Sequence, residues 1–190
     1  MKDTEKYMNP FNDVAFKRIF GQEANKSLLI SFLNSLLGDE IHIEDVQYLN
    51  KEFTPDDDNS RATVYDLLCK LDSGELCLVE MQNYKQPYFI DRTVLYVAQN
   101  IIRESQKGGR WNYKMMKIYC IAFMTRKDDN LDDGEVRIDA KLCSLKSGKI
   151  ISELQHYVFL QLPCFNKKVD ECTDFLAHLQ KSVDSLAEYH

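Results

Sequence analysis

Apolar positions recur with two periods along the chain, and these periods separate predicted helices from predicted strands. Helical spacing marks four stretches: residues 9–20, 24–37, 88–107 and 169–187. The clearest is 24–37, where the apolar stripe ends at Gly38, a residue that commonly stops a helix. The sequence therefore predicts two short helices near the N-terminus, a long central helix and a terminal helix.

Shorter apolar runs predict strands within residues 43–53, 62–71, 75–82, 115–124, 136–143 and 150–162. The second and third runs are separated by Asp72-Ser73-Gly74, and the last two surround Ser147-Gly148. Both arrangements are typical of β-hairpins. Strands and helices mixed in this order predict an α/β or α+β fold, with one central mixed β-sheet flanked by helices.

Composition narrows the class of protein. A chain of 190 residues, 44% hydrophobic and 28% charged, suits one globular domain spanning residues 1–190. The N-terminus lacks the apolar run of a signal peptide, and no run is long enough to cross a bilayer. Six scattered cysteines without a CxxC pair indicate reduced thiols. We expect a soluble cytoplasmic protein with no membrane partner.

Charge is unevenly distributed along the chain. The net charge of −6 is unlike the overall electrostatics of a typical nucleic-acid-binding domain. Residues 88–117 differ, because they hold two acidic residues and six basic ones: Arg92, Arg103, Lys107, Arg110, Lys114 and Lys117. A local basic surface of this kind is sufficient to contact phosphates.

The hairpin around residues 72–74 carries the most chemistry. A three-residue loop would place glycine at the left-handed position that ends such loops. Leu71 would then pair with Glu75, and Asp66 would lie opposite Glu80, with Cβ atoms about 4.5–5.5 Å apart. A two-residue turn would instead put the two carboxylates on opposite faces, as ordinary solvated or salt-bridged groups. The sequence leaves both registers open.

In the three-residue register, Asp66, Glu80 and Gln82 share one face of the hairpin with Val64, Leu68, Leu76 and Leu78. The other face is wholly apolar and carries Tyr65, Leu67, Cys69, Cys77, Val79 and Met81. Two facing carboxylates on a partly buried sheet repel each other and are costly to desolvate. A divalent cation removes both penalties, and hard oxygen donors suit Mg²⁺ or Mn²⁺. We therefore predict a metal site at Asp66 and Glu80.

Seven segments of the chain together form a recognisable set: residues 8–21, 24–34, 65–69, 79–83, 86–92, 111–113 and 162–167. In these segments the chain resembles the PD-(D/E)XK nuclease-family transposases, also described as recombination-promoting nucleases, which are common in bacterial mobile elements. The likeness covers nearly the whole chain. It implies a restriction-endonuclease-like core, a metal-dependent nuclease site and action on DNA.

The resemblance also implies roles for single residues. Asp66 matches the motif aspartate, and Glu80 matches the acidic residue of the (D/E)-x-K element. Gln82 stands where the broader superfamily has lysine, and this departure leaves open how the attacking water is activated. An amide can orient that water but cannot act as a base. Asp13 matches, more weakly, an N-terminal acidic position of related nucleases and completes the catalytic candidates.

The predicted helix 88–107 carries a polar stripe made of Tyr88, Arg92, Tyr96, Gln99 and Arg103. The resemblance implies that this helix leans over the active site. Arg92 would contact phosphate, Tyr96 and Gln99 would support the site, and further DNA contacts would come from Arg103, Lys107 and Arg110. The alternative is a solvated helix face, and for Gln99 and Arg103 we favour that alternative.

Two functions follow as alternatives. The first is a divalent-metal-dependent DNA endonuclease associated with transposition or recombination of a mobile element. The second is a catalytically decayed module of the same fold that serves DNA association or oligomerisation, for which a homodimer is one form. Related chains continue into a helical C-terminal region, so residues 1–190 could be a shortened domain. The four histidines have no ligand spacing, and we assign them no role.

Overall fold

The computed structural model of the chain describes residues 13–50, 52–53, 63–83, 87–105, 112–131 and 134–164. The helices are α1 (Asp13–Phe20), α2 (Lys26–Leu37) and α3 (Phe89–Glu104), with 3-10 turns η1 (Glu23–Asn25) and η2 (Leu162–Cys164). The strands are β1 (Val46–Tyr48), β2 (Glu52–Phe53), β3 (Thr63–Val64), β4 (Leu67–Leu71), β5 (Leu76–Gln82), β6 (Ile118–Met124), β7 (Arg137–Cys143) and β8 (Ile150–Gln161).

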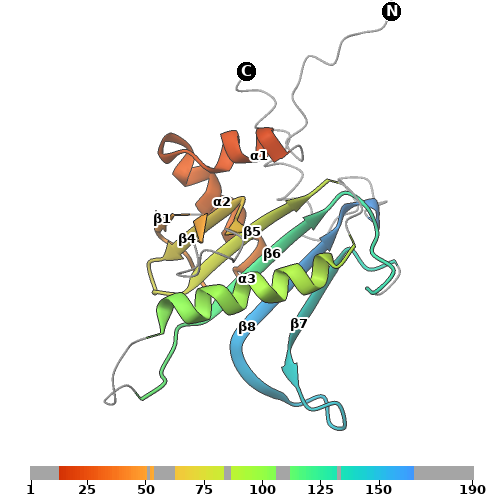
Figure 1. Cartoon of the computed structure of the whole chain (residues 1–190). Coiled ribbons are helices and arrows are strands. Elements are labelled where there is room, and N and C mark those ends of the chain that lie inside the picture. Colours follow the sequence, from red (N-terminus) through yellow and green to blue (C-terminus); the bar gives the residue numbers. More distant parts are fainter. Residues whose placement is uncertain are drawn as a thin grey trace, which may run out of the picture.

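Six strands form a mixed sheet in the order β1-β4-β5-β6-β8-β7. The central strands β5, β6 and β8 are parallel, and the outer neighbours pair antiparallel. Helix α3 covers one face of this sheet, while α1 and α2 lie on the other side (Figure 1). Strands β2 and β3 pair with each other in a separate two-stranded sheet. The predicted α/β architecture, a central mixed sheet flanked by helices, is confirmed.

Strands β5 and β6 are buried on both faces, which explains why their sequences are nearly continuous apolar runs. On the side of α1 and α2, Leu29, Leu33 and Phe16 pack against the sheet and are almost fully buried. On the side of α3, Phe89 and Val97 form a second cluster over the opposite face. Truncating one of these side chains to alanine typically costs about 2–5 kcal/mol.

The β4–β5 hairpin has the register expected from a three-residue loop. Gly74 is in the left-handed region with φ +102°, and the Leu71 N–H donates to the Glu75 carbonyl at 2.8 Å. Leu67 pairs with Val79, so the next pair outward is Asp66 with Glu80. The two-residue alternative, with the carboxylates on opposite faces, is excluded.

The predicted faces of the hairpin need one correction, at Tyr65. Strand β3 ends at Val64 and belongs to the small sheet, and the chain bends at Asp66 before β4 begins. This bend interrupts the alternation of side chains, so Tyr65 packs on the α3 side, with its ring 5.2 Å from the ring of Tyr96 in an edge arrangement. The prediction that Tyr65 shares the opposite, wholly apolar face was therefore wrong.

Helix α3 begins later than predicted, because Tyr88 adopts a left-handed conformation with φ 61° and precedes the first helical residue. Predicted features at residues 9–12, 106–110 and 169–187 lie outside the described residues. The five described cysteines are free thiols, as expected. Among the described residues, no helix is long and apolar enough to span a membrane.

Candidate active site

Two backbone hydrogen bonds tie the paired carboxylates together where β4 and β5 meet the bend. The Asp66 N–H donates to Glu80 Oε1 at 3.1 Å, and the Met81 N–H donates to Asp66 Oδ2 at 2.8 Å. The Glu80 side chain is only 4% exposed, compared with 12% for Asp66. The strand pairing therefore brings both predicted metal ligands together, with Glu80 in the interior.

The electrostatics of this pair are unfavourable for two negative charges. Burial, followed by the charge of Asp66, raises the pKa of Glu80 from 4.5 to about 8. The Asp66 N–H, Arg92 and Lys17 oppose this shift without cancelling it. The buried position therefore disfavours a second negative charge beside Asp66. Two facing carboxylates in such a position offer four hard oxygen donors, which suit a divalent cation such as Mg²⁺ or Mn²⁺.

Two basic side chains from different helices reach the carboxylates. Lys17, on α1, places Nζ 2.7 Å from Asp66 Oδ1. Arg92, on α3, lies 4.0 Å from Glu80 Oε2, and its guanidinium sits 5.3 Å from the ring of Phe89 and 5.6 Å from that of Tyr96. These ring contacts orient the guanidinium through cation–π attraction. Arg92 thus lies beside the site, where the sequence placed it.

Gln82 lies on the same side of the sheet as Glu80, as predicted, and is 6% exposed. Its side-chain Oε1 accepts a hydrogen bond from Arg92 at 3.2 Å. Its backbone carbonyl accepts the Thr125 N–H at 3.0 Å. The amide that replaces the motif lysine therefore contacts the α3 arginine and carries no charge of its own.

Tyr96 and Gln99 connect α3 to the segment that leads into the bend. The Tyr65 hydroxyl donates to Gln99 Oε1 at 3.1 Å, and Gln99 Nε2 donates to Thr63 Oγ1 at 2.9 Å. Tyr96 is 8% exposed and packs edge-on against Tyr65. Gln99 therefore does not lie on the solvated helix face that we favoured, because its amide bonds to the side chains of Tyr65 and Thr63.

The remaining candidates differ in what the structure describes of them. Arg103 is exposed and donates to the Asn50 carbonyl at 3.0 Å. Lys107 and Arg110 lie outside the described residues, and so does the side chain of Asp13, the first residue of α1. Their DNA-binding and catalytic roles stay predictions.

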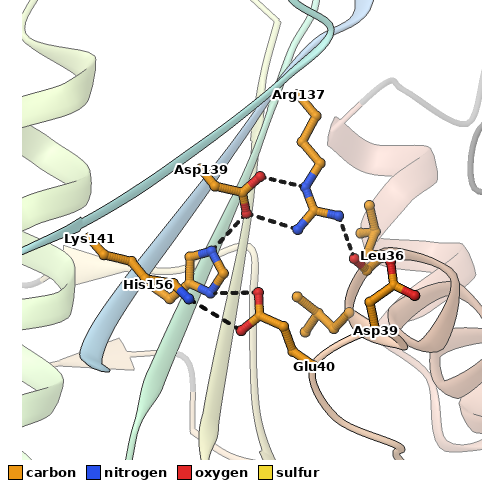
Figure 2. Close-up of a pocket in the computed structure, with 8 residues that line it drawn as sticks. Leu36, Asp39, Glu40, Arg137, Asp139, Lys141 and His156 are labelled. Carbon is orange, nitrogen blue, oxygen red and sulfur yellow. Dashed lines mark hydrogen bonds and ion pairs between the residues drawn. The ribbon is translucent and has the colours of Figure 1, made fainter. Parts of the chain in front are cut away.

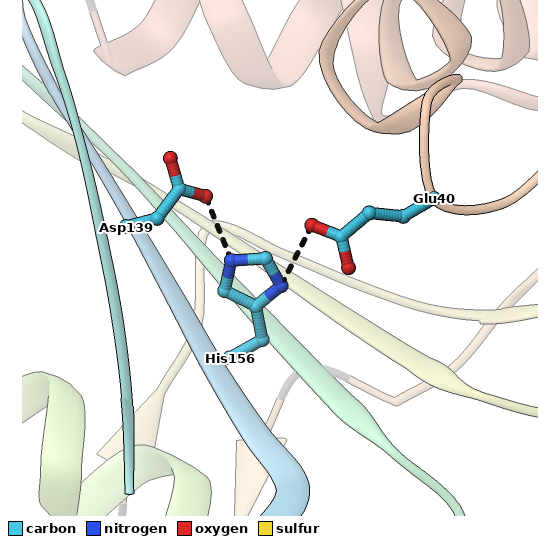
Figure 3. A group of neighbouring side chains, drawn as sticks. All are labelled: Glu40, Asp139 and His156. Carbon is cyan, nitrogen blue, oxygen red and sulfur yellow. Dashed lines mark hydrogen bonds and ion pairs between the residues drawn. The ribbon is translucent and has the colours of Figure 1, made fainter. Parts of the chain in front are cut away.

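A second group of potential metal ligands lies on the other face of the sheet. Glu40, which follows α2, meets Asp139 of β7 and His156 of β8 beside a cavity of about 270 Å³ (Figure 2). The fully buried imidazole of His156 lies between the two carboxylates, with Nε2 2.7 Å from Asp139 Oδ1 and Nδ1 3.3 Å from Glu40 Oε1 (Figure 3). By distance alone, these three residues could hold a metal ion.

The carboxylates of this second group are already compensated by basic side chains. Lys117 lies 3.0 Å and Lys141 3.5 Å from Glu40, and Arg137 lies 2.7 Å from Asp139. Burial alone would raise the pKa of both carboxyls. At Glu40 the two lysines and His156 outweigh burial and lower the pKa. At Asp139 His156 and Arg137 do the same. A divalent ion would have to compete with those cations, so we interpret the group as an ion-pair network.

Sequence reasoning missed two residues now seen at these clusters, Lys17 and His156. Lys17 lies in segment 8–21, one of those that carry the family resemblance, and this placement was the available signal. His156 directly precedes the apolar run 157–160 in β8, and a lone histidine there indicates a buried polar contact. Its partner Glu40 lies more than a hundred residues away, which no local pattern reveals.

The β4–β5 register, the paired carboxylates beside α3 and the mixed sheet define a protein with the PD-(D/E)XK nuclease fold. The family model described as PD-(D/E)XK nuclease family transposase matches residues 10–188, and the chain belongs to this family. The match confirms the resemblance and supports a nuclease or transposase role. No curated protein and no solved structure matches the chain.

Proposed function

We propose that this protein is a divalent-metal-dependent DNA endonuclease that acts in transposition or recombination of a mobile element. The observation that carries the proposal is the meeting of Asp66 and buried Glu80 across one strand pair, where burial and the neighbouring carboxylate raise the pKa of Glu80. Family membership supports the same reaction class.

Asp66 and Glu80 would hold Mg²⁺ or Mn²⁺. A cation bound there supplies charge to the scissile phosphate and lowers the pKa of a water molecule. In the hydrolysis, the water oxygen bonds to phosphorus, one P–O ester bond breaks, and the leaving oxygen takes up a proton to become a hydroxyl group. Most of the catalytic effect then comes from positioning and charge neutralisation, which this chain supplies with side chains from three elements.

Arg92 is the phosphate contact that α3 supplies in this proposal. Its guanidinium is held between the amide of Gln82 and two aromatic rings, which limits the orientations available to it. A guanidinium can donate two parallel hydrogen bonds to phosphate oxygens. Tyr96 and Gln99 hold α3 against the bend, and Arg103, Lys107 and Arg110 would extend the phosphate contacts along the DNA.

The test is a plasmid-nicking assay on the full chain with Mg²⁺ or Mn²⁺, comparing wild type with Glu80→Gln and Asp66→Asn. Both variants should lose cleavage at least about a thousandfold, because each removes a charged ligand from the site. Glu153→Gln is the matched control, since it removes an exposed carboxylate on β8 and should cut like wild type. Melting curves identify a variant that fails to fold.

The same assay distinguishes an active endonuclease from the alternative function, a catalytically decayed module that serves DNA association or oligomerisation. If wild type binds duplex DNA but nicks no faster than Glu80→Gln under any divalent ion, the nuclease proposal is wrong and the module remains. Light scattering at several concentrations measures whether the chain forms the homodimer that the module would use.

A further inference from the structure

We infer that Lys17, on α1, supplies the positive charge that the nuclease motif carries in its own strand and that this chain lacks at Gln82. In this inference, which rests on the proposed function, the Lys17 ammonium contacts the phosphate that is cut. Sequence position would not suggest this role, because Lys17 precedes the first motif residue by about fifty positions.

The side chain at position 82 carries no charge of its own, because it is an amide. Gln82 is neutral, nearly buried and bonded to Arg92. Among the described residues, the cation in contact with Asp66 comes from the opposite side of the sheet, with Lys17 Nζ 2.7 Å from Asp66 Oδ1. The bend between β3 and β4 makes this contact possible, because it takes Asp66 out of the regular ladder at the end where α1 crosses.

Helix α1 is fixed firmly enough to aim this side chain. Its neighbour Phe16 is 2% exposed and packs against the ring of Phe123 in β6 at 6.0 Å. At the end of the helix, the Phe20 carbonyl accepts the hydroxyl of Tyr48 at 2.7 Å. The backbone on both sides of Lys17 is therefore anchored to the sheet, and its side chain extends from a defined position.

Exposure distinguishes Lys17 from the two carboxylates of the site. Its side chain is 33% exposed, while those of Glu80 and Asp66 are 4% and 12% exposed. The ammonium is therefore more accessible to an incoming phosphate than the carboxylates are. A lysine ammonium is a compact charge on a flexible stem, so it can turn from a carboxylate oxygen to a phosphate oxygen without movement of the helix.

The assigned role is electrostatic. Phosphoryl transfer spreads negative charge over the phosphate oxygens in the transition state, and a preorganised cation beside them lowers the barrier. Arg92 on α3 and Lys17 on α1 would hold the phosphate from two sides. Neither Arg92 nor Lys17 acts as the base that removes a proton from the attacking water.

The experiment compares Lys17→Met, Lys17→Arg and the matched control Arg18→Met in the full chain. Arg18 is the next residue on α1, carries the same charge and is exposed. Three quantities are measured: single-turnover cleavage with Mn²⁺, the salt dependence of duplex-DNA binding in EDTA, and Mn²⁺ affinity by calorimetry.

Lys17→Met should cut about 100- to 1000-fold more slowly. Its binding should lose about 0.9 from the salt slope, the value for one phosphate contact. Mn²⁺ affinity should be unchanged or tighter, because a competing cation has left Asp66. Lys17→Arg should recover most of the cleavage, and Arg18→Met should match wild type in cleavage.

Two results would overturn the inference. The first is cleavage by Lys17→Met at the wild-type rate. The second is a loss of Mn²⁺ affinity in Lys17→Met that Lys17→Arg does not restore, since Lys17 would then merely position Asp66. If no form of the protein cuts DNA, the proposed nuclease fails, while a salt slope lowered only in Lys17→Met still supports the phosphate contact.

Discussion

The two faces of the central sheet carry acidic clusters of similar size and opposite electrostatic character. Beside α3, Asp66 faces Glu80, and burial together with the charge of Asp66 raises the pKa of Glu80 to about 8 although Arg92 and Lys17 oppose the shift. Beside α2, Glu40 and Asp139 have His156 and three basic side chains around them, and the pKa of both carboxyls falls. The first cluster is arranged to receive a cation, whereas the second already has its counter-charges.

Removing one carboxyl from each cluster should have opposite consequences, and this is the largest effect we expect. Glu80→Gln should abolish metal-dependent cleavage while leaving the fold at least as stable at pH 8, because burial disfavours the ionised carboxyl at this position. Glu40→Gln should leave single-turnover cleavage intact and cost about 1 kcal/mol of unfolding free energy, as expected for a partly exposed ion pair. Cleavage lost in Glu40→Gln and retained in Glu80→Gln would reverse the assignment.

The two clusters should also respond oppositely to pH in EDTA. Folded protein keeps the Glu80 proton up to about pH 8, while the unfolded chain releases it near pH 4.5. Stability should therefore fall as pH rises between those values, by a few kcal/mol at most. The lowered pKa values of Glu40 and Asp139 have the opposite sign, so their contribution is lost as pH falls below about 4.

Urea unfolding from pH 3 to pH 9 measures both limbs of this profile. Glu80→Gln should flatten the limb above pH 5 and leave the acid limb in place. If the variant shows the same decline above pH 5 as wild type, Glu80 does not retain a proton in the folded protein.

Metal binding should discriminate between the clusters by melting temperature. Mn²⁺ binds only where folding has brought ligands together, so at 100 times its dissociation constant it should stabilise wild type by about 2.7 kcal/mol. Asp66→Asn should remove this increment, and His156→Gln should retain it in full. An increment lost in His156→Gln and kept in Asp66→Asn would move the metal to the Glu40–Asp139–His156 group.

The smallest expected effects concern the basic residues of α3. Arg92→Ala should weaken DNA binding and slow cleavage, because Arg92 lies beside Glu80 and Gln82. Arg103→Ala should weaken binding only slightly and leave single-turnover cleavage unchanged, because its guanidinium bonds to the Asn50 carbonyl. Filter binding at two salt concentrations and quenched single-turnover reactions measure the two quantities. Equal effects of both substitutions on binding and cleavage would mean that Arg92 does not contact the phosphate at the active site.

Local sequence predicted the hairpin but left two registers open. The structure has the three-residue loop with Gly74 in the left-handed region, and this register places Asp66 opposite Glu80. The position of Tyr65 could not be predicted, because the bend at Asp66 depends on a hydrogen bond from the Met81 backbone on the neighbouring strand.

Contacts between distant segments account for the rest of what sequence reasoning missed. Lys17 reaches Asp66 only because Phe16 and Phe20 bury one side of α1 against the sheet and α2. His156 meets Glu40 only after α2 has packed across β6 and β8. Periodicity identifies the helix and the strand in each case, but it carries no information about which side chains will meet between them.

The ion-pair network on β7 has a further consequence, for association of the chain with itself. Among the described residues, strand β7 is the last strand of the six-stranded sheet, and a sheet edge that no strand covers is a template on which a strand of another molecule can add. Arg137, Asp139 and Lys141 place a charge at every second position of this edge. An added strand would have to bring its own side chains against these charges. The network that holds α2 to the sheet thus also discourages aggregation through β7.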